Sequence, residues 1–118
     1  MWKNRPARGF VVFLIAFGVR AGVVASIPDI RISSDSEEYL RLADSLREER
    51  AFARNGRPET YRTPGYPFFL FLLQSLGLES PRGIALAQAA LSAAGVMLTF
   101  AAAERLFGGP AAWTAAIL

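Results

Sequence analysis

The chain has 118 residues, a formal net charge of +3 at neutral pH and a hydrophobic content of 53 %. This length fits a single small domain, and so small a charge, with basic residues dispersed along the chain, does not favour nucleic acid as a partner. The absence of cysteine excludes disulfides and thiolate metal sites, and the absence of histidine leaves Asp and Glu as the candidate groups for proton transfer.

A short basic tail, residues 1–8, precedes the apolar segment Gly9–Ile27. At about 1.5 Å of rise per residue, a helix of this length matches the hydrocarbon thickness of a bilayer. The segment carries one charged residue, Arg20, which we expect to face protein or to reach toward the membrane surface. The alternative is a cleaved signal peptide, with the small residues Val24–Ser26 at the cleavage site; the length of the apolar segment and Arg20 favour a first transmembrane helix.

Residues 28–83 are predicted to form a long, mainly polar connection, and its length predicts helices within it. Ser34–Glu37 matches the S-x-x-E capping pattern, and apolar residues recur after it at three- and four-residue steps. This spacing predicts an amphipathic helix over about 36–50 that lies along the membrane interface. Its carboxylates are predicted to form a solvated face: Glu37, Glu38, Asp44, Glu48 and Glu49.

The polar residues 51–63 are predicted to be irregular, with a turn at Asn55–Gly56. The next segment, Thr63–Pro67, is a rigid corner, because each proline fixes its own φ and restricts the residue before it. Pro67 is predicted to take the first position of a short apolar helix, about 68–76, which is too short to span a bilayer.

A second transmembrane helix is predicted over 84–107, with a face of small residues that lets another helix approach closely. After a Gly-Pro turn, 111–118 is interpreted as the start of a third transmembrane helix that is cut short. Basic residues near the helix ends, such as Arg105, favour a cytoplasmic N-terminus and an extracytoplasmic loop over 28–83. The predicted fold class is therefore all-α and integral to the membrane, with interfacial helices in a long first outer loop.

Two charged side chains of this loop are candidates for chemistry. Asp35 lies at the start of the amphipathic helix, where free N–H groups would hold its carboxylate either as a cap or as a general base. Arg62 precedes the rigid corner, where paired N–H donors would contact a lipid phosphate or the head groups of the bilayer. The neighbouring Tyr61 and Tyr66 are candidates for interface anchors or for substrate contacts.

The order of these elements resembles a known family. The likeness lies in a D-x-x-x-Y-x-x-x-A pattern at Asp35, Tyr39 and Ala43, an R-x-P-G-Y-P pattern at Arg62–Pro67, and the Arg105–Gly108 segment after the second helix. Together they resemble the N-terminal part of the GT-C superfamily of membrane glycosyltransferases. The group is the one similar to dolichyl-phosphate-mannose protein mannosyltransferases and bacterial aminoarabinose transferases, and the likeness covers nearly the whole chain.

The resemblance implies transfer of a sugar from a polyprenyl-phosphate donor on the extracytoplasmic face of a bacterial inner membrane. It implies Asp35 as the catalytic base and Arg62 as the residue that meets the lipid phosphate. No cofactor is predicted, whereas the need for a divalent metal, the sugar and the acceptor stay open. Members of the family have many more transmembrane helices, so we expect an N-terminal fragment that is inactive alone. The alternative is a small non-enzymatic membrane protein whose Ala- and Gly-rich helix binds partner helices.

Overall fold

The computed structural model describes residues 5–118 and is 73 % helical. The predicted all-α class is confirmed, with the addition of a small two-stranded hairpin. The chain divides into two units. One combines both ends of the chain, up to Pro28 and from Ala85 onward, and the other is Asp29–Ile84.

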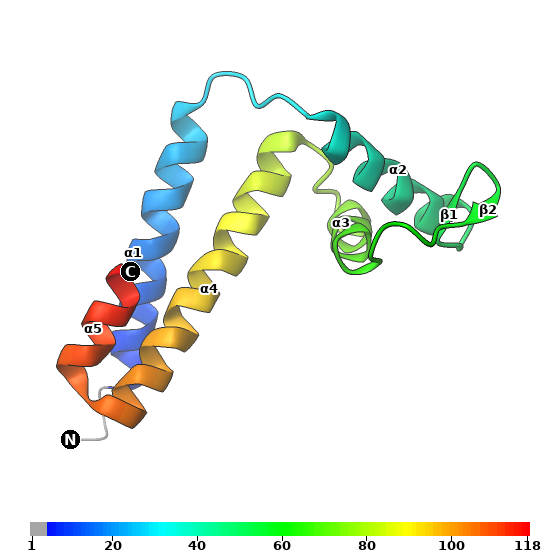
Figure 1. Ribbon diagram of the computed structural model, residues 1–118. Coiled ribbons are helices and arrows are strands. Elements are labelled where there is room, and N and C mark those ends of the chain that lie inside the picture. Colours follow the sequence, from blue (N-terminus) through cyan, green and yellow to red (C-terminus); the bar gives the residue numbers. More distant parts are fainter. Residues whose placement is uncertain (1–4) are drawn as a thin grey trace. The chain divides into compact units, whose positions relative to one another are not determined.

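The unit made from the chain ends contains three helices (Figure 1): α1 (Arg5–Ser26), most of α4 (Pro81–Phe107), and α5 (Gly109–Ile117). Each helix contributes one buried residue to a common core, which consists of Val12, Phe100 and Ala112. The rings of Phe100 and Trp113 meet edge to face with centroids 5.1 Å apart, which is a favourable aromatic geometry. This core fixes α5 against the two long helices.

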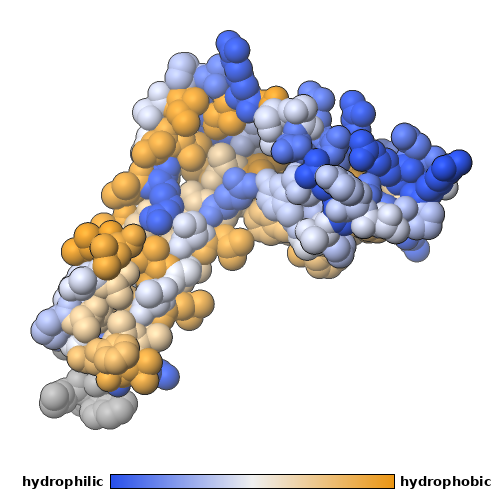
Figure 2. All heavy atoms as spheres, in the orientation of Figure 1, coloured by the Kyte–Doolittle hydropathy of each residue, from blue (hydrophilic) through white to orange (hydrophobic). Residues whose placement is uncertain are grey.

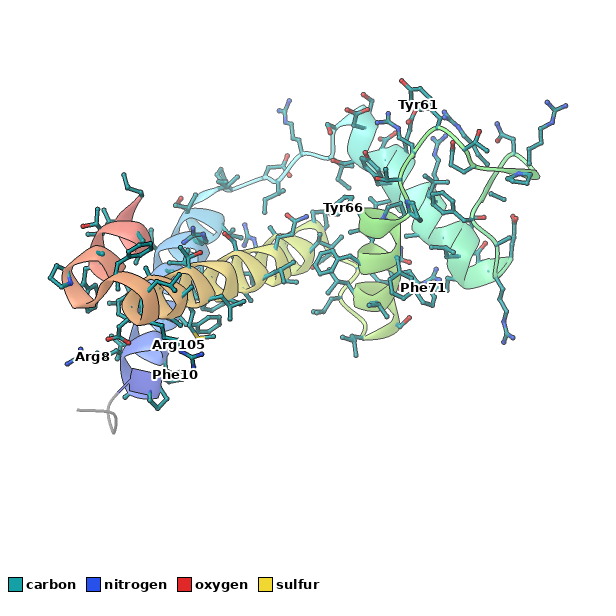
Figure 3. The ribbon with its side chains drawn as sticks, turned by 60° about the horizontal axis from the view of Figure 1, so that its bottom comes forward. Arg8, Phe10, Tyr61, Tyr66, Phe71 and Arg105 are labelled. Atoms are coloured by element: carbon teal, nitrogen blue, oxygen red, sulfur yellow. The ribbon has the colours of Figure 1, made fainter. Side chains whose placement is uncertain are left out.

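Helices α1 and α4 run antiparallel (Figure 1), and an ion pair joins the N-terminal part of α1 to the C-terminal part of α4. Arg8 Nη1 donates to Glu104 Oε1 at 3.3 Å, and the Glu104 side chain is 8 % exposed. In Figure 3, Arg8 and Arg105 are seen at the same end of the unit. The first basic residues of α1 and the last basic residue of α4 therefore share one end, as the sequence predicts.

Both α1 and α4 are long and apolar enough to cross a membrane, by length and composition. Only 11 % of the apolar window of α1 and 17 % of that of α4 are buried, whereas the core helix of a soluble protein would be mostly buried. Figure 2 shows hydrophobic residues along the unit that contains them and hydrophilic residues over the other unit. An exposed apolar surface of this kind indicates association with a membrane.

The long helices begin earlier than predicted. The start of α1 at Arg5 makes 5–8 of the predicted tail helical, while 1–4 lie outside the described residues. Helix α4 begins at Pro81, before the predicted residue 84. Ser80 caps it, because the Ser80 hydroxyl accepts the Gly83 N–H at 3.0 Å. A proline at the first position loses no hydrogen bond, because that N–H has no partner within the helix.

The second unit contains α2 (Ser34–Glu48), the strands β1 (Ala53–Arg54) and β2 (Arg57–Pro58), and α3 (Gly65–Ser75). Helix α2 packs on α3 through buried apolar residues, Leu42 and Ala43 from α2 and Leu70 and Leu73 from α3. One polar contact joins the same helices, since Gln74 Nε2 donates to Asp44 Oδ1 at 2.9 Å.

The segment predicted to be irregular contains the hairpin of β1 and β2, and this part of the prediction is wrong. Strands of two residues are too short to show the alternation that identifies a strand in a sequence. The turn at Asn55–Gly56 is confirmed. Both residues have positive φ, 52° and 75°, as the tight turn of a two-residue hairpin requires.

The predicted cap of α2 is also wrong, because Ser33 and not Ser34 occupies that position. The Ser33 backbone is extended, with ψ of 163°, and its hydroxyl accepts the Ser36 N–H at 3.3 Å. Ser34 is already helical, so it cannot take the extended conformation that a capping residue needs. The S-x-x-E box therefore does not form, because Glu37 is four residues after the capping serine, Ser33, and the box requires three.

Helix α3 begins at Gly65, so the predicted placement of Pro67 at its first position is wrong. Pro67 lies in the first turn, where a missing N–H costs little. At the other end, Gly77 has a φ of +79°; its N–H donates to the Gln74 carbonyl at 3.0 Å, and the Leu78 N–H donates to the Leu73 carbonyl at 2.9 Å. This pair of bonds is a Schellman motif, which satisfies the last carbonyls of the helix.

Candidate functional site

The first turn of α2 meets the segment before α3 at Arg62. Arg62 Nη2 donates to Asp35 Oδ1 and to Glu38 Oε2, each at 2.9 Å. The two carboxylates are three positions apart on α2, so they lie on the same face of the helix. Asp35 and Arg62, the two charged residues selected from the sequence, are therefore in direct contact.

Aromatic rings surround the guanidinium. Its carbon lies 5.2 Å from the centre of the Tyr39 ring and 5.5 Å from that of the Tyr61 ring, within the range of cation–π attraction. Tyr66 meets Tyr39 edge to face, with ring centroids 5.1 Å apart, so it packs against one of the two rings beside the guanidinium. Figure 3 shows Tyr61 on the loop and Tyr66 at the start of α3. Of the two predicted tyrosines, Tyr61 contacts Arg62 and stays 83 % exposed.

Glu38 was predicted to belong to a solvated face of carboxylates, and this is wrong. Its side chain is 34 % exposed and binds two guanidiniums, because Oε2 accepts from Arg62 and Oε1 accepts from Arg54 Nη2 at 3.1 Å. Hydrogen bonding to Glu38, and after it to Asp35, holds the pKa of Arg62 above its ordinary value, so this guanidinium stays charged. Asp44 is likewise engaged, with Gln74 of α3. The other three predicted carboxylates are exposed: Glu37 and Glu48 in α2, and Glu49 at its C-cap.

Glu59 orders the backbone that carries Arg62, and the sequence analysis assigned it no role. Glu59 Oε1 accepts the N–H of Tyr61 at 2.6 Å and that of Arg62 at 3.3 Å, and its side chain is 4 % exposed. The Tyr61 N–H bond lowers the pKa of Glu59, although burial acts in the opposite direction. Its position could have identified Glu59 from the sequence. The residue lies two positions before Tyr61 and just before the proline-rich corner, where a carboxylate commonly accepts backbone N–H groups.

A cavity of ≈ 180 Å³ adjoins the cluster between α2 and the hairpin. Its polar lining includes Glu38, Arg54 and Glu59, the carboxylates and cation that support Arg62, together with Arg41 and Asn55. Among residues 5–118, no group of three or more acidic, histidine or cysteine side chains is suited to hold a metal ion. The site therefore combines an exposed carboxylate, a fixed cation and a small polar cavity.

The guanidinium is already occupied, which restricts how it could contact a phosphate. Both N–H groups of Arg62 Nη2 are used by carboxylates, and the Nε is buried without a hydrogen-bond partner. The third nitrogen, Nη1, donates to the Tyr39 hydroxyl at 3.5 Å. A phosphate that bound Arg62 through Nη2 would have to displace one carboxylate. Asp35 is 72 % exposed and Glu38 is 34 % exposed, so Asp35 is the one that can move into solvent.

Comparison of the chain with protein-family models, with curated proteins and with solved structures found no match. What the site can do is therefore inferred from its residues and their geometry.

Proposed function

We propose that this chain is the N-terminal part of a membrane glycosyltransferase of the GT-C kind, which transfers a sugar from a polyprenyl-phosphate donor to an acceptor. The observation that carries the proposal is the 2.9 Å contact between Asp35 and Arg62. These residues are 27 positions apart, and the motifs that contain them are the ones on which the resemblance to this superfamily depends. A catalytic base beside a cation is the arrangement that direct displacement at a phosphate-linked carbon needs.

In the proposed reaction, Asp35 takes the proton of an acceptor hydroxyl or amine. The acceptor atom then attacks the anomeric carbon, and the bond from that carbon to the phosphate oxygen breaks. The electron pair leaves with the polyprenyl phosphate, whose negative charge Arg62 stabilises. At the end of the step the proton is on the carboxyl group of Asp35, and the sugar is on the acceptor.

Glu38 provides Arg62 with a second carboxylate partner, which a single ion pair with Asp35 would lack. When Asp35 turns toward an acceptor, Glu38 still neutralises Arg62 and keeps its guanidinium in the same orientation. Arg62 thus loses only one of two carboxylate partners, which lowers the cost of releasing the base. Glu38 is accordingly a positioning residue, and Asp35 is the catalytic residue.

The proposal includes a topology. Helices α1 and α4 each cross the bacterial inner membrane once, with the N-terminus in the cytoplasm and residues 29–84 on the extracytoplasmic side. The support for this topology is the apolar, mostly exposed surface of both helices and the basic residues gathered at the Arg8 and Arg105 end. A polyprenyl-phosphate head group lies at that outer surface, on the same side of the membrane as the site in this topology.

The experiment is a transfer assay with membranes that contain the complete gene product. A panel of polyprenyl phosphates, each carrying a different radiolabelled sugar, is supplied, and label in the acceptor fraction is measured. We expect one donor to be used, and Asp35→Asn to lower its transfer by about 10²-fold or more, since it removes the basic lone pair but keeps the shape. Glu37→Gln is the matched control, because Glu37 is an exposed carboxylate of the same turn. No transfer from any donor, or an Asp35→Asn variant as fast as the control, would contradict the proposal.

A further inference from the structure

Arg20 is a cation within an apolar helix, and the described residues provide no anion for it. Its side chain is half-buried, and Nη1 donates at 3.0 Å to the carbonyl of Ala16, in the same helix. Over residues 5–118, the ion pairs of the protein do not include Arg20. An ionisable residue in a membrane span is costly and normally pairs with another group.

The hydrogen bond with Ala16 also fixes the depth of the guanidinium. A helical side chain leans toward the N-terminus of its helix, and here it reaches back four positions, to the middle of the 22-residue α1. At about 1.5 Å per residue, Ala16 is roughly 15 Å from the Ser26 end of the helix. The charge therefore lies near mid-membrane depth and not at the surface.

Arg20 lines a groove of ≈ 280 Å³ in the unit formed by α1, α4 and α5. Apart from Arg20 the lining consists of apolar and aromatic side chains, among them Val12 and Val19 from α1, Val96 from α4, and Trp113 and Ile117 from α5. A groove with apolar walls and one unpaired guanidinium is complementary to an apolar segment that carries one anion.

We propose that this groove receives a transmembrane helix with an aspartate or glutamate at its centre, whose carboxylate pairs with Arg20. A phospholipid is a poorer fit, because its phosphate lies at the membrane surface, roughly 15 Å from the level of Ala16. A second copy of the chain is also a poorer fit, since the one carboxylate in α1, α4 and α5 is Glu104, near the end of α4 and paired with Arg8. The inference rests on the membrane insertion that the proposed function includes, and not on sugar transfer.

The test uses the protein reconstituted in lipid vesicles together with fluorescent single-span peptides of Leu and Ala. One peptide has Glu at its centre and the other has Gln, and energy transfer to a dye on the protein reports association. We expect the Glu peptide to bind about tenfold more tightly than the Gln peptide, as a charge-assisted hydrogen bond would produce. Arg20→Gln should abolish this difference, whereas Arg31→Gln, which removes a charge just outside α1, should preserve it.

Because the two peptides differ while the protein stays the same, the comparison does not depend on how a variant folds. Equal binding of both peptides would overturn the proposal. So would an Arg20-dependent enrichment of phosphatidylglycerol around the protein without any preference for the Glu peptide, since it would assign the groove to a lipid. Failure of the protein to float with the vesicles would reject both this proposal and the membrane topology. Preference for the Glu peptide without sugar transfer by the complete gene product would support the groove and reject the reaction.

Discussion

Glu59 determines the local backbone on which the Arg62 cluster depends. Its Oε1 accepts two successive N–H groups. Among the described residues, the nearest guanidinium is that of Arg54, 4.0 Å from Oε2. The turn is therefore held mainly by the carboxylate form acting on backbone donors. Because the carboxylate form is the better acceptor, the order of this turn should depend on pH.

We expect the 59–62 turn to lose protection in acid. The pKa of Glu59 in the folded protein lies below its ordinary value of 4.5, so its contribution to stability is complete above that value and is lost as the pH falls through the folded pKa. Glu59→Gln should remove this part of the pH dependence, because the amide keeps an acceptor oxygen but does not titrate. Hydrogen exchange of the Tyr61 and Arg62 amides across pH 3–6 measures this pH dependence. If the protection of these amides changed with pH in the same way in the variant, the role of Glu59 would be contradicted.

We expect Glu38 to affect the rate of sugar transfer by orienting the Arg62 guanidinium. In Glu38→Ala, Arg62 keeps Asp35 as its only carboxylate partner, so the base is held in the ion pair and the guanidinium is less well oriented. We expect kcat for sugar transfer to fall by about 10- to 100-fold, as for other small misplacements at a reacting centre, with a smaller change in KM. Glu37→Ala, one position earlier and exposed, should change neither constant. A change confined to KM would identify Glu38 as a binding residue instead.

The sequence identified the charged pair but not the residues that support it. Asp35 and Arg62 were selected from their positions beside a helix start and a proline corner, and no spacing rule linked the two across 27 residues. Glu38 could have been included, because its three-residue separation from Asp35 places it on the same face of α2. The contact between Glu38 and Arg54 could not have been predicted, because it depends on a hairpin that the sequence pattern does not reveal.

At the scale of elements, the end of α3 depends on one backbone conformation. Gly77 has a φ of +79°, in the left-handed region that side chains with a Cβ rarely adopt. We expect Gly77→Ala to destabilise the protein by about 1 kcal/mol. Gly65→Ala is the matched control, since Gly65 has no positive φ and an added Cβ there meets nothing within 4 Å. Its effect should be neutral or slightly stabilising. Denaturant unfolding in micelles compares the two, and equal losses would contradict this role of Gly77.

Long elements were predictable from the sequence, and short ones were not. The helix over 36–50 was identified because apolar side chains recur at three- and four-residue steps. The helix over 68–76 was identified from an apolar run that follows Pro67. Their first residues were misplaced because a cap is chosen by the backbone conformation of one residue, as at Ser33, and neighbouring serines are equivalent in sequence. The hairpin was missed because four strand residues carry no periodicity, although its Asn55–Gly56 turn was evident.

At the scale of the whole molecule, the two long helices predict on which side of the membrane each segment lies. If α1 and α4 each cross the membrane once, residues 29–84 face one side and the Arg8 and Arg105 end faces the other. The 118 residues contain no cysteine, so a single cysteine introduced into this chain is a unique label within it. We expect Glu37→Cys to react with an impermeant maleimide from outside intact cells, and Leu106→Cys to react only after the cells are opened. Labelling of both cysteines from the same side would contradict two crossings.

The ion pair between Arg8 and Glu104 has a consequence for biosynthesis. Its partners are 96 positions apart, so at 5–20 residues per second a ribosome needs about 5–20 s to produce the second after the first. If α1 enters the bilayer as proposed, it stays there during that delay without the Glu104 carboxylate that pairs with Arg8 and without the residues of α4 and α5 that line the groove beside Arg20. Slow translation of the intervening codons would lengthen this exposed interval, and with it the time during which quality-control proteases can reach the nascent chain.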